Sequence, residues 1–278
     1  MFAITLVLVF VAILVLAALR FCKRRSPQQS RPSSSVEPAS AKVQTSSLSE
    51  KLYALAQTVF NQATSSHYQH RHEAAAAQVV FSPDGKTCTA LTDCSGFVSY
   101  LMVEVAPLQY KQLLPNADLN SPHPLAGKFA WFFSNLTTAN GGWVKVPNVQ
   151  SLRCGDLIAW HDNSAQTPGP GHHNTGHVMV VAAQPSEPVE EMVAGSQIRY
   201  VSVEVIDCSS DRHFPKEELP PLAGQLQRDG LGKGTVRIVL DSEGNSIGYW
   251  EGTYSSERNA PIDAPSSTDM IGFARLVD

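Results

Sequence analysis

The first hydrophobic pattern in the chain is continuous. Residues 2–19 contain no charged residue and no proline, and Arg20, Lys23, Arg24 and Arg25 follow almost at once. As a helix, these 18 residues would span about 27 Å, just enough for the hydrocarbon core of a membrane. A cleaved signal peptide would carry basic residues before the apolar stretch and small residues at a cleavage site. We therefore expect residues 1–25 to form an uncleaved membrane anchor with a basic flank.

A polar segment separates this stretch from a chain with regular periodicity. Residues 26–46 are rich in Ser, Pro and Gln and have few apolar side chains. Such a segment cannot bury enough surface to fold, so we interpret it as a flexible tether. The remaining residues, 47–278, are long enough for one globular domain with additional strands at its C-terminal end.

Helical periodicity marks the first part of that domain. Ser47 and Glu50 have the spacing of a capping box and precede an amphipathic pattern that ends at Phe60. A second helical pattern follows Asp93, whose carboxylate can serve as the N-cap, and stops at Pro107. Its apolar stripe consists of Phe97, Val98, Leu101, Met102 and Val105. Residues 129–133 predict a further short helix.

Strand patterns dominate the second half. Residues 200–207 alternate between apolar and polar side chains, as a half-buried strand does. Residues 157–160 are continuously apolar, and 176–182 are apolar except for His177. Further strands are expected at 144–146, 234–240, 246–252 and 271–277. Helices first and strands afterwards indicate an α+β fold.

Composition restricts the possible partners. The net charge of −4 gives no indication of nucleic-acid binding, which usually needs a basic face. The chain has five cysteines, so they cannot all pair with one another. Cys88, Cys154 and Cys208 could include a disulfide, although connectivity cannot be read from sequence.

A histidine-rich segment, residues 66–73, allows more than one interpretation. His67, His70 and His72 could bind a metal, line a substrate cleft or belong to a solvated loop. No cluster of Cys or His elsewhere has matching zinc-ligand spacing. We therefore favour the solvated loop and expect neither a metal nor a cofactor.

Cys94 is the candidate nucleophile. It would be the first residue of the helix after Asp93, where the positive end of the helix dipole favours a thiolate. The alternative is a buried cysteine that acts as a small hydrophobic residue. The residues around Cys94 and a downstream histidine favour the nucleophile.

A cysteine nucleophile needs a base and a group that orients the base. His177 opens an apolar strand after a glycine, whereas His172 and His173 lie in the preceding loop. If the strands of His177 and Asp207 pair antiparallel, the start of the first lies opposite the end of the second. Asp207 could then fix the imidazole tautomer. Glu204 and Ser209 are weaker candidates for this role.

Three segments together resemble the NlpC/P60 family of papain-like cysteine peptidases. They are Asp-Cys-Ser-Gly-Phe-Val (93–98), Cys-Gly-Asp-Leu-Ile (154–158) and Gly-His-Val-Met-Val (176–180). The resemblance implies an α+β fold with helices packed on an antiparallel sheet. It also implies that Cys94 is the nucleophile, His177 the base and Asp207 the third member. The family often has a tyrosine that lines the cleft, and Tyr68 matches it.

The resemblance also implies a substrate and a location. The family mostly hydrolyses amide bonds in peptidoglycan stem peptides, with Tyr68, Asp93 and Ser95 at the substrate and backbone N–H groups near Cys94 stabilising the oxyanion. We therefore expect a membrane-tethered cell-wall endopeptidase whose domain faces the cell envelope, although the basic flank favours the cytoplasmic side. Two alternatives remain: an amidase or acyltransferase acting on another acyl substrate, and a catalytically silent envelope-binding module.

Overall fold

A computed structural model describes residues 46–70, 73–114, 121, 123–137, 140–161, 176–193, 196–210, 213, 229–250 and 270–278. The predicted anchor, and all but the last residue of the predicted tether, lie outside these ranges.

The first helix begins where the capping box predicts. In α2 (Leu48–Gln62) the Ser47 side chain accepts a hydrogen bond from the Glu50 backbone, and Glu50 accepts one from the Ser47 backbone. The histidine-rich segment then departs from the expected loop, because its first residues belong to a strand, β1 (Ala63–Tyr68). This strand pairs parallel with β3 (Cys88–Thr92), which pairs antiparallel with β2 (Val79–Phe81).

Three helices follow the small sheet β1-β3-β2. The helix expected after Asp93 is α3 (Cys94–Val105). Pro107 does more than stop it, because this residue starts α4 (Pro107–Lys111), where its missing N–H costs no helical hydrogen bond. The aromatic segment near residue 130 forms α5 (Ala126–Asn135). Single turns of 3₁₀ helix occur at Ala75–Ala77 and Val149–Ser151.

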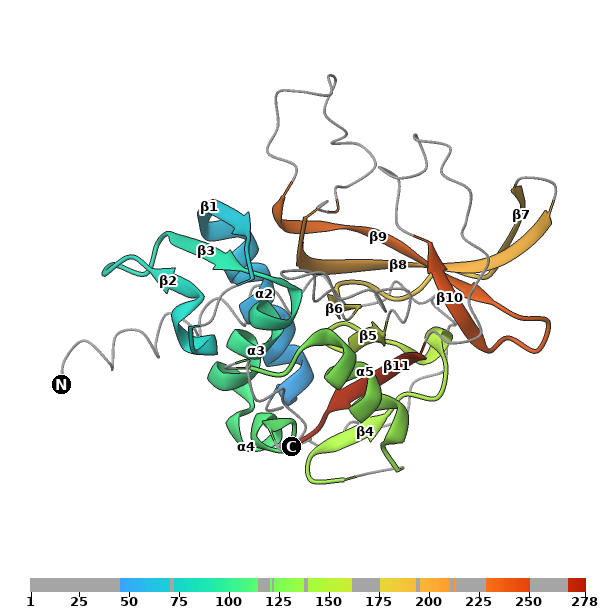
Figure 1. Ribbon diagram of the computed structural model, residues 1–278, viewed down its shortest axis with the longest axis horizontal. Helices are drawn as coiled ribbons and strands as arrows, with labels where there is room; N and C mark the ends of the chain where they lie inside the picture. Colours follow the sequence, from blue (N-terminus) through green and yellow to red (C-terminus); the bar gives the residue numbers. More distant parts are fainter. Residues whose placement is uncertain are drawn as a thin grey trace, which may run out of the picture.

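The main sheet has eight strands, all paired antiparallel. Its order is β10-β9-β8-β6-β5-β11-β4, with β7 paired to β8 (Figure 1). The strands are β4 (Trp143–Lys145), β5 (Leu157–His161), β6 (His177–Val181), β7 (Val189–Val193), β8 (Ser196–Ser209), β9 (Gly230–Leu240), β10 (Ser246–Trp250) and β11 (Met270–Leu276).

Both faces of the central strands are covered, which explains their continuous apolar sequences. In β5, Leu157 and Ala159 join the core that contains the helices, whereas Ile158 and Trp160 join a second core on the other face. Helix α3 contacts β6, and α5 contacts β5 and β11. On the other face, β10 contacts β11, and Tyr249 of β10 stacks on Trp160 with ring centroids 3.8 Å apart. The sheet therefore curls around the second core.

The predicted fold class is wrong. We expected an α+β, papain-like arrangement of helices packed on an antiparallel sheet, with an N-terminal transmembrane helix. Strands instead outweigh helices in the described residues, and an eight-stranded antiparallel sheet dominates them. The sequence pattern missed the small sheet formed by residues 63–92. It also underestimated β8 and β9, whose antiparallel pairing extends from Arg199 to Ser209.

The membrane predictions are also corrected. No helix within the described ranges is long and apolar enough to cross a membrane. The apolar run at residues 2–19 meets the minimum length of a span only if it is helical throughout, and it lies outside the described residues. We therefore withdraw the single-pass anchor, the membrane as a partner and the envelope-facing location.

The segment Cys-Gly-Asp-Leu-Ile joins the sheet to α2. Gly155 has a φ of +84°, and a side chain there would collide with the backbone carbonyl of Ser49. Asp156 is fully buried and accepts hydrogen bonds from Arg275 of β11 at 2.8 and 2.7 Å. The glycine thus allows α2 to approach, while the ion pair ties the start of β5 to β11.

We predict that Gly155→Ala costs at least about 2 kcal/mol more stability than Gly244→Ala. Both glycines have nearly the same φ, +84° and +86°, so the conformational penalty of about 1–2 kcal/mol is common to both. No atom lies within 4 Å of a side chain built at Gly244, whereas at Gly155 the Ser49 backbone must move. Urea unfolding of the two variants measures the difference. Equal losses would contradict the close approach.

Candidate active site

The turn between β3 and α3 places Cys94 at the first position of the helix. Asp93 is the N-cap: its Oδ1 accepts hydrogen bonds from the Gly96 backbone at 2.7 Å and from the Ser95 hydroxyl at 2.8 Å. These bonds fix the first helical turn, as a capping carboxylate does. Cys94 is 4% exposed, on the face of α3 that joins the core.

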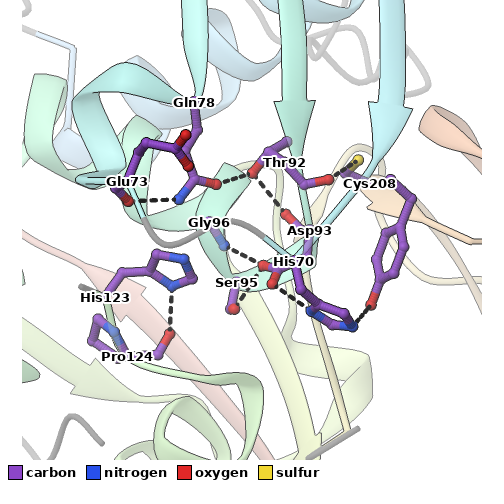
Figure 2. A network of polar contacts seen from close by, with 11 residues as sticks. His70, Glu73, Gln78, Thr92, Asp93, Ser95, Gly96, His123, Pro124 and Cys208 are labelled. Atoms are coloured by element: carbon purple, nitrogen blue, oxygen red, sulfur yellow. Dashed lines mark hydrogen bonds and ion pairs between the residues drawn. The ribbon is translucent and has the colours of Figure 1, made fainter. Parts of the chain in front are cut away.

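Gly96 is required by packing against this turn (Figure 2). A side chain at Gly96 would collide with Gln78 and Thr92. Thr92 donates a hydrogen bond to Gln78 at 2.5 Å, and Gln78 donates one to the Glu73 carbonyl at 3.2 Å. In the Asp-Cys-Ser-Gly segment, the glycine is therefore needed for close packing and the aspartate for capping the helix.

The sheet brings His177 and Asp207 together. Strands β6 and β8 pair antiparallel, with Val180 opposite Ile206, so the start of β6 lies beside the end of β8 as predicted. His177 Nε2 lies 2.5 Å from Asp207 Oδ2. Asp207 is fully buried, and the His177 side chain is 15% exposed.

The contacts of His177 define its tautomer. The pKa of Asp207 lies well below its usual range: burial opposes ionisation, but the charge of His213 and a hydrogen bond from His177 outweigh it. An ionised carboxylate only accepts hydrogen bonds, so Nε2 of His177 carries the proton that faces it. Nδ1 is then the ring nitrogen that is left to accept a proton, as a general base requires.

The pKa of His177 is raised well above its ordinary value. Burial opposes protonation, but the charge of Cys94, a hydrogen bond to Asp207 and a hydrogen bond with Cys94 outweigh it. The indole of Trp160 packs against the ring, with centroids 5.4 Å apart. Such an imidazole favours an ion pair with a thiolate.

A second histidine, which the sequence did not indicate, contacts the same carboxylate. His213 Nδ1 lies 3.1 Å from Asp207 Oδ1 and 3.0 Å from Oδ2, and its side chain is 9% exposed. It follows β8 in a segment with no hydrophobic periodicity. Only the three-dimensional structure, which places His213 beside Asp207, reveals the contact.

Tyr68 and His70 lie on the other side of the helix cap. Figure 2 shows the His70 ring directed at Asp93. His70 Nδ1 is 2.9 Å from the second oxygen of Asp93, and the Tyr68 hydroxyl is 3.5 Å from His70 Nε2. Burial, followed by the charges of Cys94 and Asp93, raises the pKa of Tyr68 above its usual range. Tyr68 is thus within electrostatic range of the candidate nucleophile, and its phenol remains neutral.

The other candidates for these roles lie elsewhere or are occupied. Ser95 is buried and bonded to Asp93, so its hydroxyl supports the cap. Glu204 forms a partly exposed ion pair with Lys233 at 3.0 Å. Ser209 is at the end of β8, where it pairs with Gly230. His172 and His173 lie outside the described residues.

The histidine-rich segment and the remaining cysteines show no metal site. Within the described ranges no group of three or more His, Cys, Asp or Glu residues could hold a metal ion. His67 lies 3.5 Å from Asp229, and His72 is outside the described residues. Cys88, Cys154 and Cys208 are not joined by disulfides, so the possible bridge among them does not form in this structure. Burial raises the pKa of Cys88 to about 11.

Comparison with known proteins gives a relative but no function. No family model matches the chain, and no solved structure matches it. A curated protein of Acanthamoeba polyphaga mimivirus, "Uncharacterized protein R653", is 27% identical over 217 residues, which cover 74% of this chain and 86% of the relative. The relative's name states no activity, so a function for this chain has to be inferred from the site.

The His70–Asp93 contact predicts a pH-dependent contribution to stability. The hydrogen bond to Asp93 raises the pKa of His70, although burial opposes this. The folded value lies above the unfolded one, so the contribution is complete below about pH 6.5 and is lost as the pH rises through the folded value. We expect wild type to lose more free energy of unfolding than His70→Ala between about pH 6 and pH 9.

Urea unfolding across this pH range tests the prediction. Asp93→Asn serves as the matched background, because it removes the charge that acts on His70. In that background, the effect of His70→Ala on the pH dependence of stability should become smaller. Parallel pH profiles of wild type and His70→Ala would contradict the assigned interaction.

Proposed function

We propose that this protein is a cysteine-dependent acyl hydrolase that cleaves an amide bond, with the chemistry of the papain-like NlpC/P60 peptidases. The observation that carries the proposal is the convergence of three elements on one point: Cys94 at the start of α3, His177 at the start of β6 and Asp207 near the end of β8. This is the arrangement of nucleophile, base and orienting carboxylate that covalent catalysis requires.

The first half of the reaction forms an acyl-enzyme. His177 Nδ1 takes the proton of the Cys94 thiol, and the thiolate attacks the carbonyl carbon of the amide. The electron pair moves to the carbonyl oxygen, where backbone N–H groups at the start of α3 can stabilise the oxyanion, because helix geometry leaves them outside the internal hydrogen bonding. The C–N bond then breaks, and His177 returns the proton to the leaving amine.

The second half releases the acid. His177 removes a proton from water, and the hydroxide attacks the thioester carbon. The C–S bond then breaks to give the carboxylic acid, and the departing Cys94 thiolate takes the proton back from His177. Asp207 holds the imidazole in the required tautomer through both halves and stays ionised. An acyltransferase would differ only in replacing water with another acceptor.

The proposal is limited to this acyl chemistry. A peptidoglycan substrate was expected together with an envelope-facing domain, and that location has been withdrawn. No contact in the described residues favours stem peptides over other amides. The silent binding module is the weaker alternative, because a pure binding surface does not need a buried carboxylate aligned on a histidine beside a helix-terminal cysteine.

We predict that Cys94→Ala lowers turnover by about 10⁴-fold or more while the fold is retained. The full chain is incubated with peptidoglycan sacculi, synthetic peptides and thioesters, and the products are identified by mass. Iodoacetamide labelling, followed by peptide mapping, should show Cys94 reacting faster than Cys88. Cys88→Ala is the matched control and should retain turnover. Unchanged turnover by folded Cys94→Ala would refute the assigned nucleophile.

His177 and Asp207 should differ in their effects. We expect His177→Ala to approach the loss seen for Cys94→Ala, because the two residues act as one unit. Asp207→Asn should be milder, since another hydrogen bond can partly hold the ring. Glu204 lies on the same strand as Asp207 but is paired with Lys233. Glu204→Gln therefore serves as the control and should have a kcat near that of wild type. A larger loss for Glu204→Gln than for Asp207→Asn would reverse the assignment.

A further inference from the structure

We propose that His213 is a positioning residue of this site: it holds Asp207 ionised and turned toward His177. The inference rests on the proposed function and deepens it, because it adds a fourth residue to the Cys94, His177 and Asp207 set. It comes from a contact and not from any sequence motif.

The geometry gives His213 control over the orientation of the carboxylate. Its Nδ1 lies almost equally far from the two oxygens of Asp207, at 3.1 and 3.0 Å. A donor shared by both oxygens restrains rotation of the carboxylate about its χ2 torsion, which is otherwise broad. Oδ2 therefore stays directed at His177 Nε2, 2.5 Å away. The two imidazoles flank the carboxylate with ring centroids 6.4 Å apart.

The buried charge of Asp207 has to be compensated by its neighbours. Asp207 is fully buried, and a buried charge is costly unless it is paired and hydrogen-bonded. Two imidazole rings contact this carboxylate, His177 through Nε2 and His213 through Nδ1. His213 thus adds a second partner to the one that the catalytic set itself supplies.

The remaining titratable groups around Asp207 do not provide that compensation. Tyr68 and Cys208 both interact electrostatically with Asp207, and both have a pKa raised by burial, so they stay neutral. Cys208 donates its S–H to the Thr92 carbonyl at 3.2 Å. Among the described groups, His213 is the one whose charge lowers the pKa of Asp207 most.

A metal site is the competing explanation for two histidines on one aspartate. The described residues contain no group of three or more His, Cys, Asp or Glu with the arrangement of a metal site. His177 Nε2 and His213 Nδ1 both point at the carboxylate itself, at hydrogen-bond distance. The two nitrogens therefore serve the carboxylate as donors.

The test uses the full chain and two variants that separate charge from hydrogen bonding. His213→Ala removes both, whereas His213→Asn keeps an N–H donor at the position of Nδ1 and loses the charge. The probe is iodoacetamide, and the readout is the second-order rate of Cys94 alkylation between about pH 4 and pH 9, quantified by peptide mapping. Turnover of any substrate found above gives kcat and KM in parallel.

We expect His213→Ala to lower kcat by about 10–100-fold with little change in KM, as loss of a partner behind a reacting group does. Without His213, Asp207 takes up its proton at higher pH, so the acid limb of the alkylation profile moves to higher pH. His213→Asn should recover most of kcat while its acid limb remains displaced. A merely structural role would not separate these two readouts.

Lys86→Ala is the matched charge control, because Lys86 pairs with Asp84 in the exposed turn between β2 and β3, and it should reproduce the wild-type profile. A wild-type kcat and acid limb in folded His213→Ala would overturn the inference; if that variant does not fold, a wild-type limb in His213→Asn does so. Zinc-dependent activity that EDTA abolishes would also overturn it. If wild-type Cys94 reacts no faster than Cys88, the proposed function fails instead, whatever His213 does.

Discussion

A buried carboxylate governs the candidate site. Asp207 has no exposed surface, and an isolated charge at such a position would shift its pKa and become neutral. It is ionised because hydrogen-bond donors from two other segments face it. Those donors can reach it only if β6 and β8 are paired in register and His213 lies beside Asp207. The requirement to compensate one charge thus couples the strand register, the tautomer of His177 and the position of His213.

Much of the local structure followed from the sequence. The capping box at Ser47, the cap at Asp93 and the apolar stripe of α3 are short-range features, and the structure confirms them. The strand candidates in the second half were also found, because alternation and continuous apolar runs reflect how many faces are buried. The predicted fold class was wrong. One reason is that β1 pairs directly with β3, although β2 lies between them in the sequence, and β2 leaves no periodic pattern.

The site also combines residues that local sequence patterns predict with contacts that only the three-dimensional structure reveals. Cys94, His177 and Asp207 could be proposed because each stands at the end of a recognisable element. Antiparallel pairing predicts that His177 and Asp207 lie close together, and the resemblance to NlpC/P60 peptidases joined Cys94 to them. The roles of His213 and of the His70–Asp93 contact could not be predicted, because segments without hydrophobic periodicity give no indication of which residues they contact. The membrane prediction rested on residues 2–19, which lie outside the described residues, and no helix within the described ranges is long and apolar enough to cross a membrane.

The arrangement of the main sheet has a consequence for how the protein becomes reactive. Cys94 belongs to an early helix, whereas Asp207 belongs to β8, whose long pairing with β9 is non-local. Non-local strand pairing forms late, after loop-closure entropy has been overcome. A growing chain would therefore display its cysteine well before any base is aligned on it. The thiol would acquire its base and the orienting carboxylate only when the strands of the main sheet have paired. Partly folded molecules would therefore have no catalytic activity.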